Sequence, residues 1–163
     1  MNDLQKVKIL NGNVNSISLE ILCKEIAKWI KEKKGRYIVV SAVHASVEAY
    51  KNQLFAKAYN GADIVLPDGR PLFWALKFLG YKDSEHLRGE FITRNVCKYA
   101  AENNFEIGFY GGKKESLDEC INVLKKDNKN LKINYNYSPK NPFTNLLIKK
   151  DFKLIDEINQ SNT

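Results

Sequence analysis

Apolar positions follow two different periods along this chain. Short apolar runs of the strand type occur at 7–10, 37–41, 64–66, 105–110 and 131–135. Between them lie stretches in which apolar residues recur every three or four positions, the period of a helix packed on one face. Strands that alternate with helices are typical of a parallel sheet covered by helices on both faces. The pattern therefore predicts an α/β fold, with the run at 37–41 buried on both sides.

Capping and turn residues predict where the helices begin and end. Ser18 is suited to N-cap a helix that runs to about residue 33, and Gly35 is expected to end it. Asn52 predicts a break in a helical stretch over 44–59. The remaining helices are expected from Pro71 to Gly80 and at about 90–102, 117–126 and 145–159.

Length and composition indicate one globular domain. The 163 residues, 44% of them hydrophobic, suffice to bury a core. No repeat, linker or low-complexity tract divides them, so we expect one domain over 1–163. The apolar runs are too short to span a bilayer, and the first residues lack the apolar segment of a signal peptide. These features predict a cytoplasmic protein.

The cysteines and histidines do not have the spacing of a metal site. Cys23, Cys97 and Cys120 are odd in number, far apart and on expected helix faces. We therefore expect three buried free thiols. With two histidines in the whole chain, a zinc site is not expected.

The net charge of +7 is concentrated in the second half of the chain. Residues 113–153 carry ten basic and five acidic side chains. Such a surface suits phosphates, an anionic membrane or nucleic acid, and it also suits plain solvation. Aromatic residues among these lysines are sparse, and no nucleic-acid-binding motif has the required spacing. Nucleic acid is therefore not an expected partner.

The segment 62–71 is the most informative part of the sequence. The apolar run at 64–66 is followed by a proline, then Asp68 and Gly69, and Pro71 opens a helix. Proline, aspartate and glycine favour a tight turn, and proline is tolerated in a first helical turn. An acid at the carboxyl end of a buried strand lies where open α/β sheets bind ligands. Asp68 is thus a candidate general base, with a purely turn-forming aspartate as the alternative.

Other polar candidates follow the neighbouring strands. Gly111 and Gly112 come between a strand and a helix, where glycine lets backbone N–H groups approach a phosphate. An ordinary turn is the alternative there. His44 follows the strand at 37–41 and is expected on the same rim as Asp68, either at a phosphate or in a structural hydrogen bond.

The polar loop at 82–89 supplies two more candidates. His86 and Arg88 are suited to close over a bound anion, and a solvated loop is the alternative. On the preceding helix, Trp74 and Phe78 are four residues apart, and we expect both to face the core.

An ordered series of segments resembles the TagA/WecG/CpsF family of bacterial glycosyltransferases. The resemblance covers about residues 5–160, and its most specific part is the run ADIVLPDG at 62–69 with tryptophan and alanine behind it. The other matching segments are VVSAVH at 39–44, LFAKA at 54–58, PLFWA at 71–75, GE at 89–90 and IGFYGG at 107–112.

The resemblance implies a fold, a reaction and a set of site residues. The fold is a Rossmann-like three-layer domain with a mainly parallel sheet and helices on both faces. The reaction is a metal-independent, inverting transfer of an N-acetylhexosamine, typically N-acetylmannosamine, from a UDP-sugar to a polyprenyl-diphosphate-linked GlcNAc acceptor. This reaction belongs to teichoic acid and other cell-surface polysaccharide synthesis, and it needs no cofactor, because the UDP-sugar is a substrate. Asp68 falls on the family's proposed catalytic base, and the expected substrate-binding residues are Ser41, His44, Gly69, His86, Arg88, Gly111 and Gly112.

The sequence also departs from the family pattern. The family's rim asparagine falls on Ala42, or on Val43 with a shift of one residue, and His86 stands in place of an arginine. The chain ends before the family's Gly-x-Pro-x-Gln-Glu segment and its basic C-terminal appendage, so we expect a truncated form. A non-catalytic remnant that binds UDP or a partner is therefore an alternative function. Peripheral contact with the inner face of an anionic membrane and a homo-oligomeric state also stay open.

Overall fold

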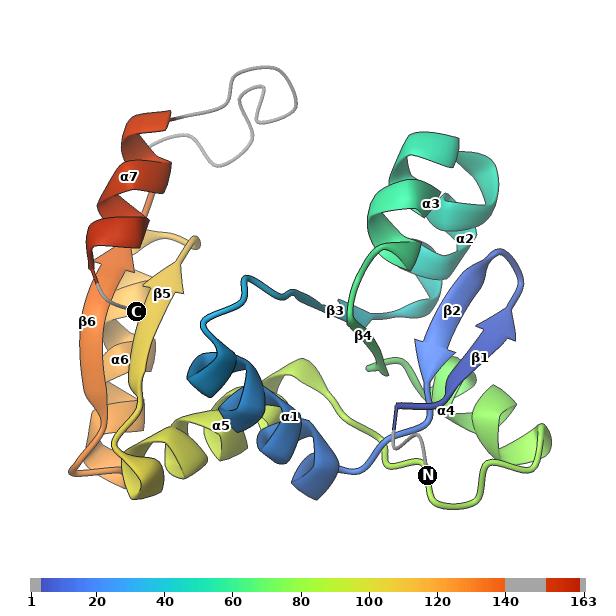
Figure 1. The fold of residues 1–163 in the computed structure, drawn as a ribbon, viewed down its shortest axis with the longest axis horizontal. Helices are drawn as coiled ribbons and strands as arrows, with labels where there is room; N and C mark the ends of the chain where they lie inside the picture. Colours follow the sequence, from blue (N-terminus) through green and yellow to red (C-terminus); the bar gives the residue numbers. More distant parts are fainter. Residues whose placement is uncertain (1–3, 140–151, 162–163) are drawn as a thin grey trace. The chain divides into compact units, whose positions relative to one another are not determined.

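The computed structural model describes residues 4–139 and 152–161 (Figure 1). The chain divides into two compact units, Met1–Thr93 and Arg94–Thr163, and we describe each unit by itself. The one domain expected over 1–163 therefore stays a prediction.

Both units combine helices with strands, which confirms the α/β class. In the described part of the chain the strands form three two-stranded sheets, of which two are parallel and one is antiparallel. The first unit contains β1 (Lys6–Ile9), β2 (Gly12–Asn15), α1 (Leu19–Glu32), β3 (Ile38–Ser41), α2 (Val43–Lys51), α3 (Gln53–Asn60), β4 (Ile64–Pro67), α4 (Arg70–Phe78) and the start of α5 (Gly89–Asn103). The second contains the rest of α5, β5 (Glu106–Tyr110), α6 (Lys114–Asp127), β6 (Lys132–Tyr137) and α7 (Phe152–Gln160). The beginning of the helix expected at 145–159 lies outside the described residues.

The helix ends confirm most of the predicted signals. The Ser18 side chain accepts a hydrogen bond from the Ile21 N–H at 3.4 Å and caps α1. The side chain of Asn52 accepts from the Phe55 N–H at 3.1 Å, which begins α3 and breaks the predicted long helix. Gly35, however, does not end α1, because Lys33 already adopts the left-handed conformation at φ 52°.

The β1–β2 hairpin was not predicted beyond its first strand. It is antiparallel, and β2 lies beside β4 in the first unit (Figure 1). Asn15 is fully buried; its side-chain oxygen accepts from the Val65 N–H at 2.8 Å, and its amide donates to the Leu4 carbonyl at 3.3 Å. A side-chain amide thus satisfies a backbone group of β4, which is why a polar segment can lie in the core.

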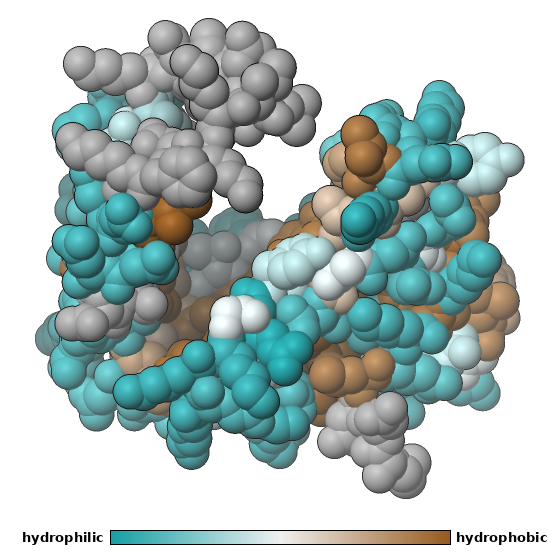
Figure 2. All heavy atoms as spheres, turned by 45° about the horizontal axis from the view of Figure 1, so that its top comes forward, coloured by the Kyte–Doolittle hydropathy of each residue, from teal (hydrophilic) through white to brown (hydrophobic). Residues whose placement is uncertain are grey.

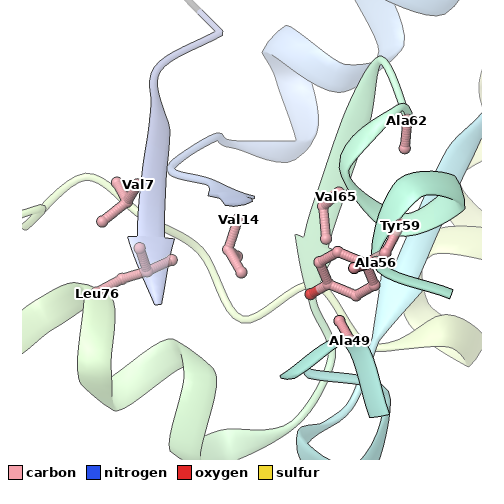
Figure 3. Close-up of a cluster of buried hydrophobic side chains, with 8 residues drawn as sticks. All are labelled: Val7, Val14, Ala49, Ala56, Tyr59, Ala62, Val65 and Leu76. Carbon is pink, nitrogen blue, oxygen red and sulfur yellow. The ribbon is translucent and has the colours of Figure 1, made fainter. Parts of the chain in front are cut away.

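Figure 3 shows the apolar cluster that the hairpin forms with β4, α3 and α4. Val14 and Val65 are fully buried within it, and the ring of Tyr59 is 2% exposed. The other buried members are Val7, Ala49, Ala56, Ala62 and Leu76.

Two predictions of burial were wrong. All four residues of β4 are buried, but Val40 in β3 is 43% exposed, since β3 pairs along one edge with β4 among the described residues. On α4, Leu72 and Leu76 are buried, whereas Trp74 is 52% and Phe78 90% exposed. Residues two apart on a helix point in nearly opposite directions, so burial of the first pair exposes the second.

The second unit is built on the parallel pair β5–β6 (Figure 1). Its core contains Cys97 and Ala100 from α5, Leu124 from α6 and Leu131, with Ile107 packed against them from β5. Cys23 and Cys97 are buried as predicted, but Cys120 is exposed on α6, which corrects that part of the prediction.

None of the helices in the described ranges is long and apolar enough to cross a bilayer. Figure 2 shows hydrophilic residues over most of the visible surface, interrupted by small hydrophobic patches. In the α2–α3 part, Tyr50 and Leu54 are 67% and 82% exposed.

Candidate active site

Asp68 lies directly after the buried strand β4, as the sequence predicts. In the β3–β4 register Ser41 is opposite Pro67, which has no N–H to donate. The next donor is the Asp68 N–H, which bonds the carbonyls of Ser41 at 3.0 Å and Leu66 at 3.1 Å. The Gly69 N–H also reaches the Ser41 carbonyl, at 3.4 Å. The carbonyl at the end of β3 therefore fixes the turn that carries Asp68.

The polar loop at 82–89 closes onto this turn through two hydrogen bonds. Nε2 of His86 lies 2.5 Å from the Asp68 carbonyl oxygen. Because a carbonyl only accepts, Nε2 must carry the proton. The Gly89 N–H donates to Oδ1 of Asp68 at 3.1 Å. The carboxylate thus accepts a bond at the first residue of α5, where the helix dipole favours negative charge.

Stacking further fixes the His86 ring. It lies against Phe73 of α4 with ring centroids 5.3 Å apart and planes at 25°. The Lys77 ammonium is 5.2 Å from the centroid of Phe73. One helix therefore begins beside Asp68 and supports the loop that bonds to it.

A polar pocket of about 370 Å³ opens beside these residues. Its lining consists of Arg70, His86, Arg88 and Phe91. Two guanidinium groups and an imidazole make this pocket suitable for an anion such as a phosphate or diphosphate. Across the described ranges, no group of three or more histidine, cysteine or acidic side chains is arranged to hold a metal ion.

The other predicted residues of the first unit differ in their access to this pocket. Gly69 is the N-cap of α4 and adjoins Asp68 directly. His44 is exposed near the start of α2. Ser41 is fully buried, and its Oγ accepts from the Tyr59 hydroxyl at 2.7 Å. The Ser41 side chain therefore faces the core in this structure, while its carbonyl bonds to the Asp68 turn.

Gly111 and Gly112 form a turn after β5 in the second unit. Both have positive φ, 110° and 73°, which glycine adopts without strain. The Gly111 N–H bonds the Tyr137 carbonyl at 2.9 Å, and the Gly112 carbonyl accepts from the Ser138 hydroxyl at 2.7 Å. The predicted glycine turn is thus present at the carboxyl end of a parallel pair.

Comparison with known proteins assigns the chain to a family. The model of the glycosyl transferase WecG/TagA/CpsF family matches residues 7–163. The chain belongs to this family. It is also 25% identical over 99 residues to an N-acetylglucosaminyldiphosphoundecaprenol N-acetyl-beta-D-mannosaminyltransferase of Bacillus spizizenii. That match covers 61% of this chain and 38% of the relative, so the chain matches well under half of that protein's length.

Sequence reasoning missed two pocket residues of this glycosyl transferase family member. Arg70 and Phe91 line the pocket with His86 and Arg88. Arg70 follows Asp68 and Gly69 at the start of a helix, and this adjacency was an available signal. No sequence signal pointed to Phe91, because its place depends on how the loop at 82–89 folds back onto β4.

Proposed function

We propose that this protein transfers an N-acetylhexosamine from a UDP-sugar to a polyprenyl-diphosphate-linked GlcNAc acceptor. The sugar that we propose is N-acetylmannosamine. Family membership and the printed activity of the Bacillus relative support the proposal. One structural observation carries it: His86, which lines a pocket with two guanidinium groups, bonds the backbone carbonyl of Asp68, whose carboxylate accepts from the Gly89 N–H. The product would belong to a cell-surface polysaccharide such as teichoic acid.

Asp68 would act as the general base. Its Oδ1 accepts from the Gly89 N–H, which leaves Oδ2 to take the proton of the acceptor hydroxyl. The hydroxyl oxygen then attacks the anomeric carbon and forms the new glycosidic bond. The bond between that carbon and the diphosphate oxygen breaks, its electron pair stays on UDP, and the configuration is inverted.

The pocket would receive the charge that develops on the departing UDP. Arg70 and Arg88 supply fixed positive charge, and no metal ion would be required. Preorganised donors of this kind stabilise a developing anion and contribute about 3 kcal/mol each when well placed. We also propose that the parallel pairs belong to a Rossmann-like fold and that the protein works at the inner face of the membrane. That Gly111 and Gly112 bind the nucleotide stays a prediction from the family resemblance.

The decisive experiment mixes the protein with UDP-N-acetylmannosamine and a lipid-linked GlcNAc acceptor and measures UDP release together with the glycolipid product. Asp68→Asn retains an oxygen that accepts from Gly89 but is not a base, so we expect a loss of about 100-fold or more in kcat. Asp63→Asn is the matched control, because Asp63 adjoins the opposite end of β4. It should retain the wild-type rate.

Two results would contradict the transfer. One is absence of UDP release by the wild type, and the other is an equal loss in both aspartate variants. Calorimetric titration with UDP then distinguishes the alternative function. Binding without transfer would indicate a non-catalytic UDP-binding protein, and loss of binding in Arg88→Gln but not in Arg36→Gln would assign the anion to the pocket.

A further inference from the structure

Three hydroxyl groups form a buried chain beneath the Asp68 turn. The Tyr59 hydroxyl donates to Oγ of Ser41 at 2.7 Å, and Oγ of Ser46 lies 3.3 Å from the Tyr59 oxygen. Oγ of Ser41 in turn donates to the Ala42 carbonyl at 3.3 Å. All three hydroxyl side chains are at most 2% exposed. Each hydroxyl hydrogen therefore has an acceptor inside the protein, and the chain of bonds joins α3 and α2 to the end of β3.

This series of hydrogen bonds ends at Ser41, the residue whose carbonyl fixes the Asp68 turn. The Ser41 carbonyl accepts from the N–H groups of Asp68 and Gly69. Beyond Ser41, the N-cap of α2 is Ala42, which makes no side-chain capping bond. The Tyr59 hydroxyl thus supplies the shorter of two side-chain bonds at the end of β3, since Oγ of Ser46 also lies 3.5 Å from Oγ of Ser41.

The ring and the hydroxyl of Tyr59 make separable contributions. The ring packs in the apolar cluster with Val14 and Val65, as Figure 3 shows. Removing only the hydroxyl leaves that packing in place and breaks the 2.7 Å bond to Ser41, which then keeps only its 3.5 Å contact with Ser46. A shift of the Asp68 turn after such a substitution would therefore result from the lost bond to Ser41 and not from a disrupted core.

We propose that Tyr59 is a positioning residue for catalysis: its buried hydroxyl, through Ser41, sets the place of the Asp68 carboxylate. The proposal rests on the proposed role of Asp68 as general base. The predicted contact between the Ser41 side chain and substrate is thereby replaced by a contact with Tyr59.

The test uses the full chain with Tyr59→Phe and a matched control, Tyr37→Phe. The Tyr37 hydroxyl also donates at 2.7 Å, to the Ala58 carbonyl, but Tyr37 immediately precedes the opposite end of β3. Amide hydrogen exchange at Asp68 and Gly69 reports the turn directly. Steady-state UDP release reports kcat and the KM for the UDP-sugar.

For Tyr59→Phe we expect exchange at both amides to become about ten-fold faster and kcat to fall about ten-fold at unchanged KM, which corresponds to about 1.4 kcal/mol. Tyr37→Phe should change neither. Unchanged exchange in Tyr59→Phe, equal effects in both variants, or equally faster exchange throughout β4 would overturn the proposal.

Ser41→Ala provides a second variant, and it decides the question if Tyr59→Phe fails to fold. It should reproduce the faster exchange and the lower kcat. A higher KM at unchanged kcat would instead indicate direct substrate contact by Ser41 and overturn the proposal. If the wild type releases no UDP, the proposed function fails, and the exchange data alone support or overturn the link from Tyr59 to the turn.

Discussion

The Asp68 carboxylate and the backbone N–H of Gly89 are joined by a hydrogen bond of 3.1 Å, although 21 residues separate them. Asp68 directly follows β4, and Gly89 is the first residue of α5. The same carboxylate that we propose as a base therefore also caps a helix. Its two oxygens allow both roles, because Oδ1 accepts from the Gly89 N–H while Oδ2 is the oxygen that we propose takes the proton.

Substitution of Asp68 should separate these roles. Asp68→Ala removes the acceptor of the Gly89 N–H, and we expect the free energy of unfolding to fall by about 1–2 kcal/mol. Asp68→Asn retains an acceptor oxygen and should lose less than half as much, although its activity is lost. Urea unfolding measures both. Equal destabilisation by the two variants would contradict the capping role.

Gly12→Ala should destabilise the hairpin through Tyr59. A Cβ at position 12 would lie 2.7 Å from Cε1 of the Tyr59 ring, and the buried ring has little space to move. Overpacking of this kind costs about 1–3 kcal/mol. Gly35→Ala is the control, because a Cβ there meets no atom within 4 Å. A similar urea midpoint for both variants would show that the ring adjusts freely.

Asp63 should make the stability depend on pH. Burial opposes its charge, but the Tyr37 N–H at 3.1 Å, the Arg36 guanidinium at 2.6 Å and the charge of Lys6 hold the pKa of this carboxyl below its ordinary value. A pKa lowered by folding stabilises the protein above the unfolded pKa of about 3.9, and the contribution is lost as the pH falls through the folded pKa.

The corresponding variant is Asp63→Asn. At pH 7 it should be about 0.5–1 kcal/mol less stable than the wild type. The difference should shrink as the pH falls below about 3.9 and disappear once the folded carboxyl, with its lower pKa, is protonated. Urea unfolding between pH 7 and pH 2.5 measures this. Arg36→Met should show the same trend in weaker form. A difference that stays constant over this range would contradict the charge interaction.

The three thiols should differ sharply in reactivity. Burial, with a smaller effect of the neighbouring Cys120, raises the pKa of Cys97 to about 11, and burial also raises the pKa of Cys23. Only thiolates react with a disulfide reagent, so we expect one fast-reacting thiol per folded chain at pH 8, that of exposed Cys120. Cys120→Ser should abolish the fast phase. Two or three fast thiols in the native protein would show that the buried sites open readily.

Local chemistry accounts for what could be predicted from the sequence. The Ser18 cap, the Asn52 break and the turn after β4 each depend on residues within a few positions, and all three were predicted. The same holds for Asp68, because a strand followed by proline, aspartate and glycine leaves the acid at a strand end wherever the strand packs.

The places where prediction was wrong depend on residues far apart in the chain. β2 has a polar sequence; it is a strand because it pairs with β1, and it lies in the core because Asn15 bonds Val65, 50 residues away. Nearly every position of α4 is apolar, so only packing decides that Leu76 is buried and Phe78 exposed.

By itself the sequence determined the α/β class, the acid at the end of β4 and the glycine turn after β5. The tertiary structure decided what these groups meet. It turned the Ser41 side chain toward Tyr59, bonded Gly89 to Asp68, and brought Arg70 and Arg88 into one pocket. Hydrogen bonds between distant segments depend on the packed chain, and so does the choice of which face of a helix is buried. No local pattern specifies either of them.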